Sequence, residues 1–163
     1  MADPAAGSLP RAPQATPTDA SGSGRRLRHI QHRAQFQWVM AGPPVVKTVH
    51  FALHLAALDA PAGDAAPAGA SPRPLFAVPA AWVGVVIPKR WAKRAVTRNM
   101  VRRQIYALAQ ERVAALPEAA VVVRLRSGFD RSRFISATSD ALKATVRAEL
   151  QQLFSRLLER RHA

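Results

Sequence analysis

The segment 89–103 carries the residues whose types and spacing are best suited to binding chemistry. Seven of its fifteen residues are Lys or Arg, and none is acidic. Its arginines include one series spaced by four residues: Arg90, Arg94, Arg98 and Arg102. On a helix this series would form one stripe, along which like charges repel each other. A polyanion bound along the stripe would relieve that repulsion, so the segment indicates a phosphate-rich partner.

The charge of the whole chain favours the same kind of partner. The 163 residues include 24 Lys and Arg against 10 Asp and Glu, which gives a net charge of +14. No acidic residue lies between Asp19 and Asp59, or between Asp64 and Glu111. Such an excess is typical of nucleic-acid-binding proteins. A solvated basic surface and an anionic membrane surface are the alternatives.

Several kinds of catalytic or metal site find little support in the sequence. Cysteine is absent, so thiolate nucleophiles and thiolate metal ligands are excluded. The pairs His29/His32 and His50/His54 have no neighbouring carboxylate or cysteine, so we expect no metal site. No residue is assigned a catalytic role, because no serine, histidine and carboxylate form a recognisable triad.

The composition predicts one domain with two flexible additions. Residues 1–24 are rich in Ala, Pro, Gly and Ser and are expected to form a disordered tail. A domain is expected over residues 25–160, interrupted by a flexible Pro/Ala/Gly-rich loop at 59–74. The longest central uncharged run, 74–88, is too short to span a bilayer. With no secretory signal apparent either, we expect a cytoplasmic protein.

Hydrophobic periodicity predicts the order helix, strand, strand, helix, strand, helix. The expected elements are a helix at 31–41, strands at 48–55 and 82–87, a helix from the basic segment to about residue 116, a strand at 119–125 and a last helix capped by Ser136 or Ser139. In the first strand, Phe51, Leu53 and Leu55 share one face, whereas His50, Ala52 and His54 share the other. The last helix has its apolar stripe at Leu142, Val146, Leu150, Leu153, Phe154, Leu157 and Leu158.

The strand Trp82-Val-Gly-Val-Val-Ile-Pro-Lys-Arg and the following Ala95-Val-Thr-Arg-Asn-Met-Val-Arg-Arg-Gln-Ile resemble the protein subunit of bacterial ribonuclease P. That family has a strand ending in a basic pair, followed by a helix with an Arg-Asn-Arg core. Segments beginning at Arg33, Phe51 and Val121 are similar to its first helix and two further strands. The resemblance covers roughly residues 27–158. The chain departs from the family pattern at four positions: Met40, His54, Met100 and Tyr106.

The resemblance implies a fold and a function. The fold would be a single-domain α/β (α+β) sandwich of the ribosomal-protein-like type. It would have a small, mainly antiparallel sheet, helices on one face and a left-handed βαβ crossover. The function would be that of the protein component of ribonuclease P, an endonuclease that removes the 5′ leader of precursor tRNA. Catalysis would belong to the RNA subunit and its Mg²⁺, and no cofactor or obligate protein partner is expected for this chain.

The resemblance also implies two sets of binding residues. The RNA subunit would be bound by Lys89, Arg90, Lys93, Arg94, Arg98, Asn99, Arg102 and Arg103. The single-stranded leader would lie in a cleft between the first helix and the sheet, at Phe36, Met40, Phe51 and His54. For Phe36 and Phe51, packing in the core is the alternative. For the whole chain, the alternatives are a ribosomal or general RNA-binding protein without an enzymatic role and a DNA-binding protein.

Overall fold

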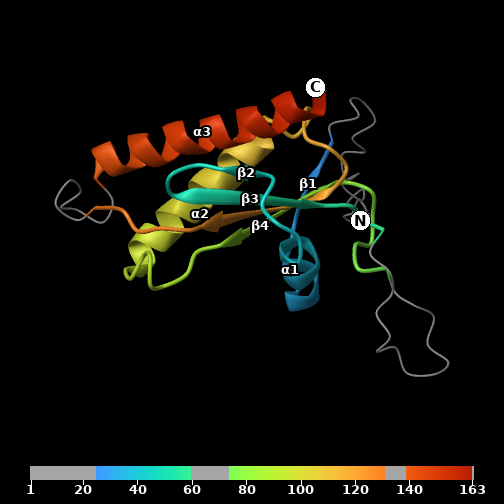
Figure 1. Cartoon of the computed structure of the whole chain (residues 1–163), viewed down its shortest axis with the longest axis horizontal. Helices are drawn as coiled ribbons and strands as arrows, with labels where there is room; N and C mark the ends of the chain where they lie inside the picture. The colour runs from blue at the N-terminus through green and yellow to red at the C-terminus, as the bar shows by residue number, and fades with distance from the viewer. Residues whose placement is uncertain (1–24, 60–73, 131–138, 163) are drawn as a thin grey trace, which may run out of the picture.

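The computed structural model describes residues 25–59, 74–130 and 139–162. These residues form, in chain order (Figure 1), β1 (Leu27–His29), α1 (Arg33–Met40), β2 (Val46–Lys47), β3 (Phe51–Ala56), β4 (Ala81–Val86), α2 (Ala95–Glu111), β5 (Ala120–Leu125) and α3 (Asp140–His162). The predicted order of helices and strands is confirmed, and the short strands β1 and β2 are additional. The predicted tail, most of the predicted loop, and Ser136 lie outside the described residues.

The five strands form one mixed sheet in the order β1-β4-β5-β3-β2. The pairs β1–β4 and β4–β5 are parallel, whereas β3–β5 and β2–β3 are antiparallel. The expectation of a mainly antiparallel sheet is therefore corrected, because β1 and β4 both run parallel to their neighbours. The adjacent parallel strands β4 and β5 are joined through α2. This is the βαβ unit for which a left-handed crossover remains a prediction.

Helices cover both faces of the sheet. Figure 1 shows α2 and α3 on one side and α1 on the other. The side chains of β5 divide accordingly: Val121 and Val123 pack in the large core with α2 and α3, whereas Val122 packs in a smaller cluster with α1. The expectation that helices lie on one face is wrong, because the short helix α1 crosses β3 and β5 on the opposite face.

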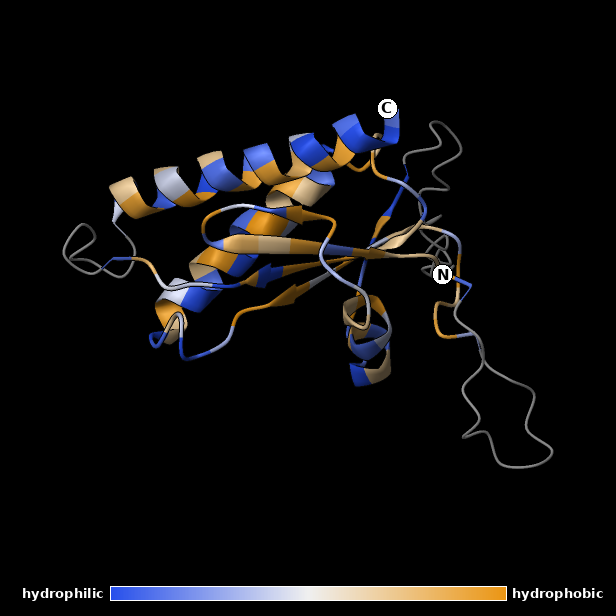
Figure 2. Cartoon of the chain, viewed as in Figure 1, coloured by the Kyte–Doolittle hydropathy of each residue, from blue (hydrophilic) through white to orange (hydrophobic). Residues whose placement is uncertain are grey.

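The last helix closes the large core. Its predicted apolar stripe is buried from Leu142 to Leu157, and Leu158 is half-buried beside it. Figure 2 shows the matching pattern, with hydrophobic colours along the central strands and alternating colours on α2 and α3. The hydroxyl of Ser139 accepts a hydrogen bond from the backbone N–H of Leu142 at 3.2 Å. This contact confirms Ser139 as the predicted N-cap.

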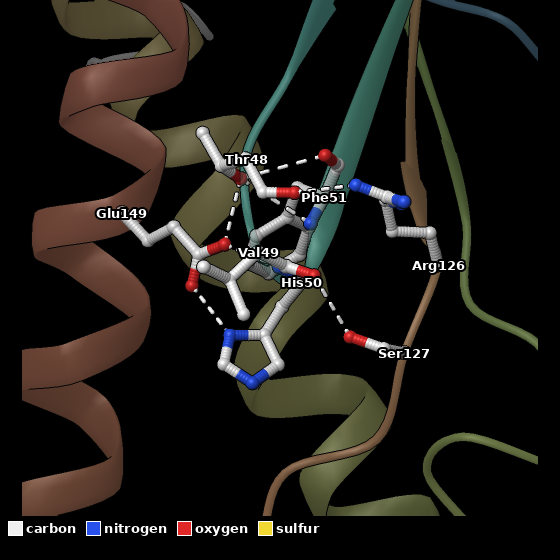
Figure 3. A network of polar contacts seen from close by, with 7 residues as sticks. All are labelled: Thr48, Val49, His50, Phe51, Arg126, Ser127 and Glu149. Atoms are coloured by element: carbon white, nitrogen blue, oxygen red, sulfur yellow. Dashed lines mark hydrogen bonds and ion pairs between the residues drawn. The ribbon is translucent and has the colours of Figure 1, made fainter.

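The hairpin β2–β3 is tied to α3 by a polar network (Figure 3). The Glu149 carboxylate accepts hydrogen bonds from the Thr48 hydroxyl at 2.6 Å and from the His50 backbone N–H at 2.5 Å. The sequence pattern placed His50 on the same face as His54. The structure places His50 before the start of β3 and toward α3, so strand alternation does not apply to it.

Candidate nucleic-acid interface

The predicted basic residues lie on and before α2. All except the half-buried Arg98 are exposed, and we call this set the basic surface: Lys89, Arg90, Lys93, Arg94, Arg98, Asn99, Arg102 and Arg103. The helix begins only at Ala95, so Arg90 and Arg94 precede it. Of the four arginines predicted to form one helical stripe, Arg98 and Arg102 therefore lie on the helix. The other two lie in the segment between β4 and α2.

The first turn of α2 also favours an anionic partner. Its N-cap residue, Arg94, makes no capping hydrogen bond with its side chain, and the first turn of α2 contains no acidic residue. A helix N-terminus carries a partial positive charge and backbone N–H groups without helical partners. Here these groups stand beside several cations, so phosphate oxygens would find both charge and donors.

Arg98 has a structural contact besides its position on the basic surface. Its guanidinium donates hydrogen bonds to the backbone carbonyls of Ala92 at 3.0 Å and Lys93 at 2.8 Å. These bonds hold the loop that carries Lys93 against the helix. Arg102 makes a longer contact of 3.4 Å to the side-chain oxygen of Asn99. Asn99 thus steadies an exposed arginine, as a brace would.

The departure at Met100 has a physical reason in this chain. Met100 is 8% exposed and packs in the large core. It therefore presents no side chain at the basic surface. Gln104 reaches from the next turn, with its side-chain nitrogen 3.4 Å from the Met100 sulfur and 3.1 Å from the Lys143 carbonyl. Met100 and Gln104 thus help to join α2 to α3, and Met100 is not available to bind a polyanion.

Phe51 is not at the predicted leader site. It is fully buried in the large core, between the sheet and α2 and α3. The predicted alternation along β3 is correct, but the long helices cover the face that Phe51 shares with Leu53. The prediction that Phe51 binds the leader is therefore wrong. The alternative prediction, that Phe51 packs in the core, is confirmed.

Phe36 and Met40 lie on the other face, where both are half-buried in the smaller cluster beneath α1. The ring of Phe36 sits directly over β4. A Cβ atom placed on Gly84 would come within 2.6 Å of Cε1 of Phe36. The glycine thus allows the aromatic ring to approach the sheet. Part of each side chain stays open to a ligand.

His54 lies on the α1 face and has one ring nitrogen without a partner. Its Nδ1 is 3.1 Å from the Gly42 carbonyl oxygen, so Nδ1 donates a hydrogen bond there. Burial lowers the pKa of His54, and the Arg124 charge lowers it further, against an opposing effect of the Gly42 hydrogen bond. The ring is therefore neutral near pH 7, and its buried Nε2 is an acceptor without a partner.

Arg124 is a site residue that the sequence interpretation did not include. It pairs across the strands with Ala52, two positions from the pair formed by His54 and Val122 and on the same face of the sheet. Its Nε is buried and has no hydrogen-bond partner. We call Phe36, Met40, His54 and Arg124 the α1-face site. The alternation of β5 would have revealed Arg124, since Val122 and Arg124 must share a face.

Within residues 25–59, 74–130 and 139–162, no three His, Asp or Glu side chains gather as metal ligands would. None of the helices in the described part of the chain has the length and apolar character needed to cross a membrane.

Comparison with known proteins decides the family. The sequence profile of the family described as Ribonuclease P matches residues 25–157. This chain belongs to the ribonuclease P protein family. The ribonuclease P protein component of Ralstonia pickettii is 38% identical over 120 residues, which cover 74% of this chain and 71% of that relative. The component of Bordetella parapertussis is 43% identical over 75 residues, which cover 46% of this chain and 57% of that relative.

A solved structure of the family has the same fold. The ribonuclease P protein of Staphylococcus aureus matches 79% of this chain and 94% of its own, with a TM-score of 0.55 and 14% identity. The resemblance derived from the basic helix is thus confirmed, as is the mixed α/β single-sheet fold. Ribonuclease P proteins are components of an endoribonuclease, and their known role is RNA-subunit binding and tRNA 5′ maturation.

Proposed function

We propose that the basic surface binds the ribonuclease P RNA subunit. The observation that carries this proposal is the position of its cations. They lie on the exposed side of α2 and of the preceding loop, and residues 65–110 contain no acid that would neutralise them. Arginine donors match phosphate oxygens in pairs, so the surface suits crowded RNA phosphates.

The α1-face site is our candidate for the 5′ leader of precursor tRNA. Half-buried Phe36 supplies an aromatic face and Met40 a polarizable apolar one, as single-stranded RNA requires. His54 Nε2 offers an acceptor and Arg124 Nε a donor, both without partners. Because both atoms are buried, direct contact with the leader falls to the half-buried Phe36 and Met40.

The chemistry is assigned to the RNA partner. Among the described residues, the chain offers no cluster of metal ligands, so the proposal leaves Mg²⁺ to the RNA subunit. There the ions would activate water and stabilise the displacement at phosphorus. The protein's part is to neutralise phosphates and to position the leader. We expect the protein to bind RNA in the cytoplasm.

The binding proposal is tested by removing charge from the basic surface without touching the fold. Arg102 and Arg103 are both exposed, and among the described residues neither side chain has a hydrogen bond to the backbone. The variant Arg102→Ala/Arg103→Ala should bind the Ralstonia pickettii ribonuclease P RNA more weakly. Its log–log salt dependence should be shallower by roughly 0.7–0.9 for each lost phosphate contact.

A matched control removes the same charge from α3. Arg156 and Arg160 are exposed on that helix and donate to the backbone carbonyls of Lys47 and Val45, so denaturant unfolding is measured beside RNA binding. The variant Arg156→Ala/Arg160→Ala should retain most of the affinity and the salt dependence. Equal losses in both variants would show that only net charge matters, and the proposed interface would be wrong.

A further inference from the structure

The basic surface continues onto an aromatic pair at the edge of the sheet. Tyr106 follows Arg98 and Arg102 at the same four-residue spacing on α2. Its ring is stacked on that of His29 in β1, with 4.1 Å between ring centroids and 17° between planes. His29 is exposed, whereas Tyr106 is half-buried. Burial raises the pKa of the Tyr106 hydroxyl, with Arg102 opposing, so the ring stays neutral.

A groove opens beside His29, along the edge strand β1. Its volume is about 550 Å³, which falls within the range of sites for small ligands. Residues from β1, α1, β4 and the segment before β4 line it: Leu27, Arg28, His29, Gln31, His32, Gln35, Pro74, Leu75, Ala77 and Trp82. We call it the β1-edge groove.

The groove combines an aromatic wall with a cationic rim. The indole N–H of Trp82 donates to the Val78 carbonyl at 3.0 Å, and Phe76 meets its ring edge-on at 5.4 Å. These contacts hold the indole in place. Arg28 and His32 are exposed at the rim, and none of the described residues that line the groove is acidic. Aromatic faces beside positive charge are the features that hold single-stranded nucleotides.

The β1-edge groove is separate from the α1-face site. It lies at the N-terminal end of α1, where the Gln35 amide donates to the Leu75 carbonyl at 2.9 Å. His54 instead contacts Gly42, beyond the C-terminal end of that helix. Across the sheet, β4 and β5 lie between β1 and β3. One nucleotide cannot occupy both places.

We propose that the β1-edge groove binds one unpaired nucleotide of the RNA subunit. Its base would lie against Trp82, and its phosphate would meet Arg28, the cross-strand neighbour of Trp82, and His32. The inference rests on the proposed function, because an RNA lying along Arg98 and Arg102 meets the Tyr106–His29 stack on one side of the edge strand β1, and the groove opens on the other side of that strand. That continuity assigns the nucleotide to the RNA subunit and not to the leader.

The experiment uses the full chain with the Ralstonia pickettii ribonuclease P RNA. The test variant is Arg28→Ala/His32→Asn, in which asparagine keeps a residue suited to the N-cap of α1. The control variant, Arg156→Ala/His162→Asn, removes the same residue types from exposed positions on α3. The measurements are RNA affinity and base-specific chemical modification of the bound RNA.

We expect the test variant to bind the RNA at least about fivefold more weakly than the wild type. A loss of this size corresponds to losing the stacking of one base. At least one unpaired base of the RNA subunit should be protected by the wild-type protein and the control, but modified with the test variant. Affinity and protection equal to those of the control would overturn the inference. Lost protection in the precursor leader instead would overturn the assignment to the RNA subunit.

The Arg102→Ala/Arg103→Ala variant separates this inference from the proposed function. If that variant binds weakly and the groove variant binds normally, the groove inference alone fails. If the Arg102/Arg103 variant also binds normally, the proposed RNA interface itself fails.

Discussion

Oε2 of Glu149 lies 2.7 Å from Nδ1 of His50, and this contact joins α3 to the turn before β3 (Figure 3). The other oxygen of the same carboxylate accepts hydrogen bonds from the Thr48 hydroxyl and the His50 backbone N–H. The turn is held from the opposite side as well, since Arg126 donates to the Thr48 carbonyl at 2.9 Å. One carboxylate on α3 therefore fixes the hairpin that begins β3.

Removing this carboxylate should destabilise the fold without affecting the RNA-binding surfaces. In Glu149→Ala, three donors near the core lose their acceptor, so we expect a loss of about 1–3 kcal/mol in the free energy of unfolding. Denaturant unfolding measures the loss. Glu159→Ala, an exposed change on the same helix, is the control and should stay within about 0.5 kcal/mol of the wild type. Similar stabilities for the two variants would contradict the role of the network.

The variants Arg98→Ala and Arg102→Ala should differ in their free energy of unfolding, although both should bind RNA more weakly than the wild type. Arg98→Ala removes two hydrogen bonds to the loop carbonyls, so we expect a cost of about 1–2 kcal/mol in unfolding free energy. Among the described residues, Arg102→Ala breaks just the long contact with Asn99 and should cost less than about 0.5 kcal/mol. Thermal and denaturant unfolding of the single variants check this order. The reverse order would show that Arg98 does not brace the loop.

His54 should make the fold sensitive to mild acid. Burial and Arg124 lower its pKa in the folded chain, whereas an unfolded histidine titrates near pH 6.5. Below that pH the unfolded state takes up the proton first, so stability falls as pH falls. The contribution of this one group is at most about 1.4 kcal/mol per pH unit.

The matched variant for this effect is His54→Gln, which cannot titrate in this range. Unfolding free energies measured from pH 7.5 to 5.0 should fall more steeply for the wild type than for His54→Gln. Parallel curves would mean that His54 takes up its proton equally well in the folded state.

Phe36 and Phe51 should have separable effects. Phe51→Ala should destabilise the fold by about 3–5 kcal/mol, because a fully buried ring leaves a cavity. Phe36→Leu should instead weaken the binding of precursor tRNA by about 1–3 kcal/mol, if its ring holds a leader base. The comparison uses a precursor with a long leader and one trimmed to a few nucleotides, with circular dichroism as the folding control. A loss equal for both precursors would exclude Phe36 from leader binding.

Part of the fold was predictable because its signals are local. The stripe from Leu142 to Leu157 and the cap at Ser139 depend only on neighbours in the sequence. By contrast, β1 and β2 contain three and two residues, which is too few for periodicity to show. The face covered by α2 and α3 depends on how distant segments connect. Alternation along β3 therefore placed Phe51 and His54 on opposite faces without showing which face those helices would cover.

The site was predictable to a similar extent. The basic surface follows from composition and spacing, but the start of α2 at Ala95 does not, since no capping side chain marks it. The α1-face site depends on the register that pairs Ala52 with Arg124. The Tyr106–His29 stack joins residues 77 positions apart in sequence, and no local pattern relates them.

We propose that the protein binds and positions RNA, whereas the RNA subunit carries out the cleavage. If the chain acts by neutralising phosphates and positioning the leader, it should not process precursor tRNA alone. With the RNA subunit, it should lower the Mg²⁺ concentration needed for cleavage, because its cations replace part of the counterions that the RNA requires.

The direct measurement is a cleavage assay with protein alone, Ralstonia pickettii ribonuclease P RNA alone, and both together, each over a series of Mg²⁺ concentrations. We predict no cleavage by the protein, cleavage by the RNA at high Mg²⁺, and accurate 5′ processing at lower Mg²⁺ when both are present. Accurate 5′ processing by RNA-free protein, or an unchanged Mg²⁺ requirement when the protein is added, would contradict the account.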